Sequence, residues 1–598
     1  MKKVLIKLLF CMPLLTSCED MFKPELENIY DEGYMHHQPA FAQSILGQSY
    51  ALLPYTTAPQ SDLATDDAVS NDINSSYLKM ATGSWASNND PLSRWKKHFY
   101  AIQNINLVLE NCDQITWAED ESANAMFNIH FKGECYAMRA LHTFFLLQTH
   151  AGRTNDGQLL GIPLHSESEN AGSDFNRPRD TFQKCVEQIL TDIDQAIKLL
   201  PLDFGDVASA EEIPAKYVQA GATAESYNRA FGRHMQGRIS SRIIEAVRAQ
   251  LLLMSASPAF SDGSGVTWQD AADNAAIVLD RIGGVDGMDS KGWTWYTNVD
   301  EITNLSAGEN PKEILWRGRI SDNNTREADN YPPSIYGKGR VNPTQNLVDA
   351  FPMANGYPIT DVQQGHFDSS QPYENRDPRL KAYVLVNGET QGVKNNVIIT
   401  GTYGTNLDKL NGENGKSTRT GYYLRKQLRP DLDLTPNKTS TQRHYTAHIR
   451  YTEIFLAYAE AANEVWGPTG KGAHSYSAYD VIKAIRTRAG VGVYNGDPYL
   501  ENAKGNKDKM RELIRNERRL ELCFENFRFW DLRRWKVELD ELNETATGME
   551  IRKVPENGSL LYLPLDVEIR NYKDYMYYGP IPYSETQKFG NLQQNAGW

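Results

Sequence analysis

The feature that most constrains the fold is a series of amphipathic patterns with helical period between residues 94 and 280. In residues 181–201, TFQKCVEQILTDIDQAIKLLP, apolar residues recur at intervals of three and four and proline ends the run. This spacing puts the apolar residues on one face of an α-helix. Residues 133–152 and 241–260 show the same pattern. The first half of the chain therefore predicts a core of packed helices.

The middle of the chain lacks this pattern. From about residue 281 to residue 440 it is rich in glycine, proline, asparagine and tyrosine, and no long helix could cross a segment such as residues 322–343. Helical patterns return in residues 448–467 and 479–491. We predict a mostly α fold, in which a tetratricopeptide-like helical-pair scaffold without a strict repeat carries a loop-rich irregular region inserted in the middle.

Residues 514–536, IRNERRLELCFENFRFWDLRRWK, combine arginines, acids and aromatics at high density. Asn526 lies where the pattern shifts, and asparagine tolerates the left-handed conformation that ends a helix, so the segment predicts helix, tight turn, helix. Charged residues three positions apart are expected to pair along each helix. The expected pairs are Arg518 with Glu521, Glu525 with Arg528, and Asp531 with Arg534. We interpret the segment as a structural clamp rather than an anion or glycan site.

The N-terminus, MKKVLIKLLFCMPLLTSCED, has the pattern of an export signal. Two lysines precede a short apolar run, and small residues precede Cys18, which indicates cleavage there. LTSC resembles the lipobox of bacterial lipoproteins, in which the cysteine receives acyl chains such as palmitate. We predict a signal peptide over residues 1–17 and a lipid anchor at Cys18, and the alternative is an ordinary signal peptide with an incidental cysteine. The acids at positions 19 and 20 resemble a surface-export tag.

Charge and cysteine content narrow the range of functions. The formal net charge is −14, the pI is about 5.5, and no basic run occurs, which argues against a nucleic-acid partner. The remaining cysteines form no CxxC pair and lie in helical, apolar patterns, so we predict buried free thiols. They are Cys112, Cys135, Cys185 and Cys523.

Several segments occur in an order typical of one protein family. They are KGECYAMRALHTFFLLQTHAG with GIPL, RPRDTFQKCVEQILTDIDQAIKLLP, PTQNLVDAFPMANG, IRYTEIFLAYAEAANE, IKAIRTRAGV, IRNERRLELCFENFRFWDLRRW and the tail YYGPIPYSETQKFGNLQQNAGW. Together with the lipobox they resemble the SusD/RagB family of nutrient-uptake lipoproteins from Bacteroidetes over nearly the whole chain. Asn526 replaces the usual glycine and Trp598 the usual tyrosine, and both changes are physically mild.

The resemblance implies a division of the chain and a role. It implies an N-terminal helical region over residues 18–280, a loop-rich ligand-binding region over 281–440, and a C-terminal helical region with the family signature over 441–598. The expected protein is a binding protein and not an enzyme, lipid-anchored in the outer membrane at the cell surface, with no cofactor. It would capture oligosaccharides, or peptides in some branches, and pass them to a SusC-like TonB-dependent transporter beneath it.

The sequence contains no motif that is specific to an enzyme. Asp66 and Asp67 could be paired carboxylates of a secreted glycoside hydrolase, but adjacent acids in such a segment are more typical of loops and helix caps. No HExxH, GxSxG or GxxxxGK[ST] motif occurs. No EF-hand spacing supports calcium, so a structural metal ion stays open. A third alternative is a pure protein-interaction scaffold.

The candidate ligand site begins in the loop GSWASNNDPLSRW, residues 83–95. Trp85 stands among small and polar residues rather than on a helical stripe, whereas Trp95 precedes Phe99 at helical spacing and is expected in the core. Trp85 could stack on a sugar ring while Asn88 and Asn89 bond its hydroxyl groups. The alternative is that Trp85 covers a neighbouring loop.

The resemblance also places ligand residues in the loops before PTQNLVDAF. In this chain those loops hold Tyr331, Tyr336 and Arg340. The predicted ligand site therefore consists of Trp85, Asn88, Asn89, Tyr331, Tyr336 and Arg340.

Overall fold

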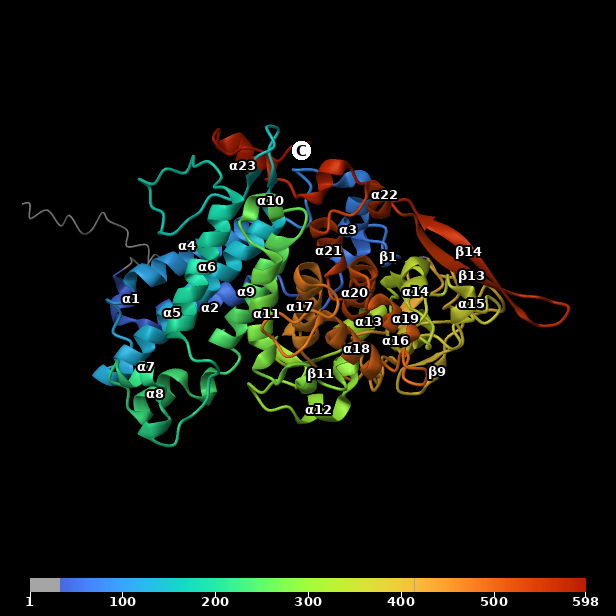
Figure 1. The fold of residues 1–598 in the computed structure, drawn as a ribbon, viewed down its shortest axis with the longest axis horizontal. Helices are drawn as coiled ribbons and strands as arrows, with labels where there is room; N and C mark the ends of the chain where they lie inside the picture. Colours follow the sequence, from blue (N-terminus) through green and yellow to red (C-terminus); the bar gives the residue numbers. More distant parts are fainter. Residues whose placement is uncertain (1–32, 414) are drawn as a thin grey trace, which may run out of the picture.

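The computed structural model describes residues 33–413 and 415–598, and most of its regular structure is helical (Figure 1). The predicted signal peptide and Cys18 lie outside these described residues. The long helices are α2 (Pro39–Ala51), α4 (Trp95–Asn111), α5 (Glu121–His150), α6 (Phe182–Leu199), α9 (Ser241–Ala256), α11 (Trp268–Asp280), α17 (Tyr451–Trp466), α18 (Ala478–Ala489) and α20 (Lys507–Leu522).

Short helices connect and cover this frame. They are α1 (Tyr34–His37), α3 (Ser76–Lys79), α7 (Ala215–Val218), α8 (Ala224–Phe231), α10 (Ser261–Ser264), α12 (Val299–Asn304), α13 (Thr325–Asn330), α14 (Gln345–Ala350), α15 (Val362–Gly365), α16 (Pro378–Tyr383), α19 (Pro498–Ala503), α21 (Arg528–Arg534), α22 (Leu539–Leu542) and α23 (Tyr583–Lys588). In the described part of residues 281–440 no α-helix exceeds six residues, which agrees with the loop-rich middle that the sequence predicts.

Local sequence signals fix where the long helices begin. The side chain of Thr181 accepts a hydrogen bond from the Lys184 amide and starts α6, and Asp120 caps α5 in the same way through the Ala123 amide. At α18 the capping box joins Ser477 to residue 480. The helices expected in residues 133–152, 181–201 and 241–260 are confirmed.

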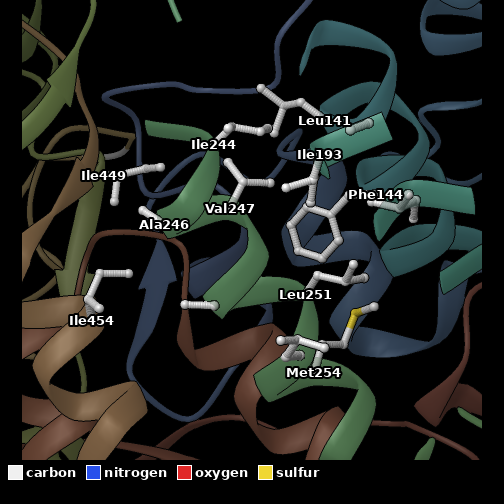
Figure 2. Close-up of a cluster of buried hydrophobic side chains, with 14 of the residues drawn as sticks. Leu141, Phe144, Ile193, Ile244, Ala246, Val247, Leu251, Met254, Ile449 and Ile454 are labelled. Carbon is white, nitrogen blue, oxygen red and sulfur yellow. The ribbon is translucent and has the colours of Figure 1, made fainter. Parts of the chain in front are cut away.

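The long helices pack in succession, and their apolar faces form one core. Helix α4 contacts α5, α5 contacts α6, α6 contacts α9, α9 contacts α11, and α11 contacts α17, which also meets α18 and α20. Figure 2 shows Phe144 of α5, Ile193 of α6 and Val247 of α9 meeting in this core. Trp95 belongs to it, as predicted, and the four described cysteines are buried and free.

Strands are short and form two-stranded antiparallel pairs in the described residues. The pairs are β1 (Ala68–Ser70) with β6 (Val341–Pro343), β2 (Gly152–Arg153) with β3 (Leu159–Leu160), β4 (Ile314–Arg317) with β12 (Ala447–Arg450), β5 (Ser321–Asn323) with β11 (Gln442–His444), β7 (Val384–Leu385) with β10 (Tyr423–Leu424), β8 (Thr390–Gln391) with β9 (Asn396–Val397), and β13 (Ala546–Lys553) with β14 (Leu560–Glu568). The hairpin of β13 and β14 extends away from the body at the right of Figure 1.

The arginine-rich segment has the predicted shape. Helix α20 ends at Leu522, Asn526 has a φ of 66°, and α21 follows at once. Asn526 also donates its backbone N–H to Asp62, so the turn is tied to the segment before β1. The clamp interpretation is supported by these contacts.

The predicted pairing of its charges is largely wrong. Only Asp531 with Arg534 forms as expected, with 2.8 Å between Oδ1 and Nε. Arg518 pairs with Asp531, Glu521 with Arg379, Arg450 and Arg488, Glu525 with Lys426 and Arg450, and Arg528 with Asp66. The cause is burial, because a charge inside the protein takes partners from every segment around it, whereas pairing along one helix describes an exposed face.

Asp66 and Asp67 belong to this clamp. Asp66 pairs with Arg519 and Arg528 at 2.8 Å, and Asp67 pairs with Arg519 at 2.7 Å. Burial alone would raise the pKa of Asp66, but the two guanidinium groups lower it below its usual range. Both acids lie in the bend just before β1, as the loop expectation had it, and they are in addition buried ion-pair partners.

A membrane-spanning helix is not found in the part of the chain that the structure describes, because none of its helices is both long and apolar enough.

Candidate functional site

Strand pairing brings two predicted loops together. Ser70 of β1 lies opposite Val341 of β6, so Asn71, which follows β1, meets the residues that precede β6. The Asn71 side chain donates to the Lys338 carbonyl at 2.8 Å, and Arg340 Nη1 lies 3.4 Å from Asn71 Oδ1. The early part of the chain and the loop-rich middle therefore share one surface.

A third loop completes this surface. Arg340 Nη1 donates to the Gly415 carbonyl at 3.1 Å, and the Ser334 amide donates to Asp408 Oδ1 at 2.8 Å. A Cβ on Gly339 would lie 2.4 Å from the Lys416 carbonyl oxygen, so only glycine allows the two loops to approach this closely. We call residues 71–74, 334–340, 407–413 and 415–417 the Tyr336 surface.

Exposed apolar and polar side chains alternate on the Tyr336 surface. Tyr336 is 55% exposed, and Ile73 and Leu407 are also exposed. Tyr336 takes a left-handed conformation, with a φ of 69°, just after a short turn of 3-10 helix. Arg340 is half-buried and has no ion-pair partner among the described residues, so its charge is not neutralised within the protein.

Tyr331 does not reach this surface, so its prediction as a ligand residue is corrected. Its ring is 1% exposed and packs with Ile335, Leu428 and Leu432, and its hydroxyl donates to the Arg429 carbonyl. The sequence showed an aromatic residue in a loop, but it could not show that residues about a hundred positions later cover the ring.

Trp85 is also buried, which corrects its prediction as a stacking platform. Its side chain is 4% exposed, packs against Phe529, Tyr572 and Trp598, and donates from Nε1 to Asp90 Oδ1 at 3.0 Å. The alternative that Trp85 covers a neighbouring segment is the one the structure supports. The segments it covers are α21 and the C-terminal tail.

Asn88 and Asn89 are exposed beside Trp85. The loop that carries them closes through hydrogen bonds between residues 86 and 89, and its Ser87 carbonyl accepts from the Tyr583 amide near α23. Five of the six predicted residues therefore fall into two sets, and the buried Tyr331 belongs to neither. Trp85 and the asparagines lie with the C-terminal tail, whereas Tyr336 and Arg340 lie with Asn71.

The predicted site does not include Asn71, Ile73 and Leu407. An isolated isoleucine in the polar run SNDINSS is a signal for an exposed apolar residue, since a turn leaves it no buried face. The pairing of β1 with β6, which joins the loops, has no local signature.

The Tyr336 surface has the groups that bind a sugar ring. An exposed tyrosine face accepts the apolar side of a pyranose, and the neighbouring Lys338 and Arg340 side chains can bond hydroxyl groups. Within residues 33–413 and 415–598 no cluster of acids, histidines and cysteines could hold a metal ion. The surface can therefore bind and orient a polar, ring-containing ligand.

Models of known protein families match both the N-terminal and the C-terminal part of the chain. The model of the SusD family matches residues 312–598, and a second model, described as starch-binding associating with outer membrane, matches residues 33–217. The SusD-like protein P38 of Formosa agariphila is 22% identical over 536 residues, which are 88% of this chain and 89% of that protein.

Solved structures share the fold over almost the full length. A SusD-like protein of Bacteroides fragilis has a TM-score of 0.70 at 21% identity and covers 96% of this chain and 99% of its own. A SusD-like carbohydrate binding protein of the same species has a TM-score of 0.64 at 19% identity and covers 93% and 99%. The predicted fold class, mostly α with a tetratricopeptide-like scaffold, is confirmed.

Proposed function

The chain belongs to the SusD family, and from this premise we propose that it captures oligosaccharides at the cell surface and delivers them to a SusC-like TonB-dependent transporter. Proteins with this fold include one described as carbohydrate binding, and the model that matches residues 33–217 is described as starch-binding. The observation that carries the proposal is the Tyr336 surface, where three loops hold an exposed ring beside polar groups.

The proposed division of labour follows the chain. Within the described chain, residues 33–280 and 441–598 hold the long helices, and residues 281–440 supply most of the proposed ligand surface. The exceptions are residues 71–74, which the pairing of β1 with β6 adds to that surface. The protein binds without catalysis, so release of reducing sugars from a bound oligosaccharide would contradict the proposal.

Replacing Tyr336 tests the ligand surface. We expect Tyr336→Ala to lower affinity for an oligosaccharide, first identified on a glycan array, about tenfold, because a stacking contact of about 1.4 kcal/mol is lost. Isothermal titration calorimetry measures this. The matched control is Tyr100→Ala, since Tyr100 of α4 is 54% exposed and lies outside the surface.

Two other outcomes would argue against this ligand site. Equal affinities of Tyr336→Ala and the wild type would remove Tyr336 from the site. Retention of peptides instead of glycans would favour the peptide-binding alternative.

A lipid anchor at Cys18 would hold the protein in the outer membrane. We expect Cys18→Ala to abolish palmitate labelling and to move the protein out of the membrane fraction, because multiple acyl chains are needed for stable anchoring. Cys11→Ala, which leaves LTSC intact, is the control and should label normally. Unchanged labelling of Cys18→Ala would rule out this anchor.

Delivery requires a partner with a pore, because a surface binder alone imports nothing. Solubilised outer membranes should yield the tagged protein together with a TonB-dependent barrel. Elution of the protein alone, under conditions that preserve comparable complexes, would count against this step.

A further inference from the structure

A second candidate site lies inside the protein, away from the Tyr336 surface. A cavity of about 170 Å³ lies between α5 and α9 on one side and α17 and α21 on the other, with Trp295 and His448 also on its wall. It brings together the N-terminal scaffold and the C-terminal clamp. The function proposed above makes no use of it.

The cavity communicates with solvent. A neighbouring hollow, lined by parts of residues 51–61 and 91–98, shares Tyr55, Arg94 and Trp530 with the cavity. Thr56 and Lys97, which also line the hollow, are exposed. The cavity and the hollow therefore adjoin at these shared side chains, close to exposed residues.

Polar atoms without partners are concentrated on the cavity wall. In a folded protein nearly every buried polar group has a partner, and one without a partner costs free energy. Six buried atoms of wall residues have no hydrogen-bond partner among the described residues. They are Tyr55 Oη, Trp295 Nε1, His448 Nδ1, Glu453 Oε2, Arg518 Nη1 and Arg533 Nη2.

The charges on the wall favour an anion. Five arginines line the cavity against three carboxylates, although the whole chain has a net charge of −14. Arg94 and Arg533 pair with no carboxylate in the described part of the chain, and burial lowers the pKa of each to about 10. Burial also raises the pKa of Glu453 to about 7, which makes the wall still less negative.

Aromatic rings also line the wall. Phe144, Phe145, Phe260 and Phe527 line the cavity, and the guanidinium of Arg94 lies 4.9 Å from the ring centre of Phe145. A ligand that satisfies this wall needs an anionic group for the arginines, hydroxyl groups for Tyr55, His448 and Glu453, and an apolar ring face.

We propose that the cavity binds a monosaccharide-sized sugar acid, with its carboxylate on the unpaired arginines and its ring against the phenylalanines. A neutral monosaccharide would leave the arginines unpaired, and a simple carboxylate would leave the hydroxyl partners unused. The inference does not rest on the Tyr336 surface, since the two sites share no residue.

The probe is D-glucuronate, titrated into the purified full-length protein, with D-glucose at equal concentration and NaCl at equal ionic strength as references. We expect saturable binding of one glucuronate and a rise in melting temperature that neither reference produces. Arg94→Gln should weaken binding at least tenfold.

Tyr55→Phe is the cleaner variant, because the hydroxyl it removes has no partner in the described protein. It should weaken glucuronate binding about threefold to tenfold without lowering the melting temperature of the free protein, because an unpartnered buried hydroxyl does not stabilise it. Tyr100→Phe, outside the cavity, should change neither quantity. Equal stabilisation by glucose and glucuronate, absence of saturable glucuronate binding, or unchanged affinity in Tyr55→Phe would each overturn the proposal. Affinity of Tyr336→Ala for glucuronate separates this site from the oligosaccharide surface, because it should remain that of the wild type.

Discussion

Replacing Arg379 with methionine is expected to lower the free energy of unfolding by about 3–5 kcal/mol, the cost of leaving buried carboxylates without their partner. Arg379 of α16 is completely buried and binds Asp377, Glu517 and Glu521, with nitrogen–oxygen distances of 2.6, 2.9 and 3.1 Å. These contacts join the loop-rich middle to α20 of the C-terminal region. Methionine has similar length but offers no hydrogen bond.

The three carboxylates would respond differently. Glu517 keeps Arg486, and Glu521 keeps Arg488, whereas Asp377 loses its only ion-pair partner in the described part of the chain. Burial alone would raise the pKa of Glu521, but the surrounding cations lower it to about 2, so it stays charged at neutral pH. The variant therefore keeps the buried carboxylate charges and loses the guanidinium group that neutralises them.

Urea denaturation at pH 7 measures the effect. Arg552→Met is the control, because Arg552 forms an exposed pair with Glu550 on the β13 hairpin and exposed pairs contribute little. We expect no measurable shift for the control. A midpoint for Arg379→Met equal to that of the wild type would show that the network does not hold α16 on α20.

The helices can be predicted from the sequence because the signals that define them lie close together in the chain. The period of α6, its cap at Thr181 and its stop before Pro201 lie within about twenty consecutive residues. Asn526 was readable for the same reason, since a left-handed residue between two helical patterns needs no distant partner to be recognised. Local chemistry and the final fold agree at these positions.

The partners of the buried charged residues cannot be predicted from the sequence. Arg528 pairs with Asp66, and Arg379 pairs with Glu517. More than a hundred positions of sequence separate the two members of each pair. Spacing along one helix suggested nearer partners, but the helix is buried and its charges face several segments. The Tyr336 surface has the same origin, because its loops meet only through the register of β1 and β6.

For Trp85 the sequence and the structure predict opposite effects of a substitution. A surface platform would lose affinity on replacement and keep its stability. The structure instead puts the indole in a small core with Phe529, Trp598 and the guanidinium of Arg533, whose carbon lies 5.3 Å from the ring centre. This core fastens the loop to α21 and to the C-terminal tail.

Trp85→Ala is therefore expected to lower the free energy of unfolding by about 3–5 kcal/mol, because a large buried ring is lost and the site cannot fully collapse. It also leaves Asp90, which accepts the indole N–H, with one hydrogen bond fewer. Asn88→Ala is the control, since Asn88 is exposed on the same loop and should change the melting temperature little. Oligosaccharide affinity, measured well below the melting temperature of the variant, should stay at the wild-type value. A variant that keeps its stability and loses its affinity would return Trp85 to the ligand surface and show that the loop opens to expose the ring.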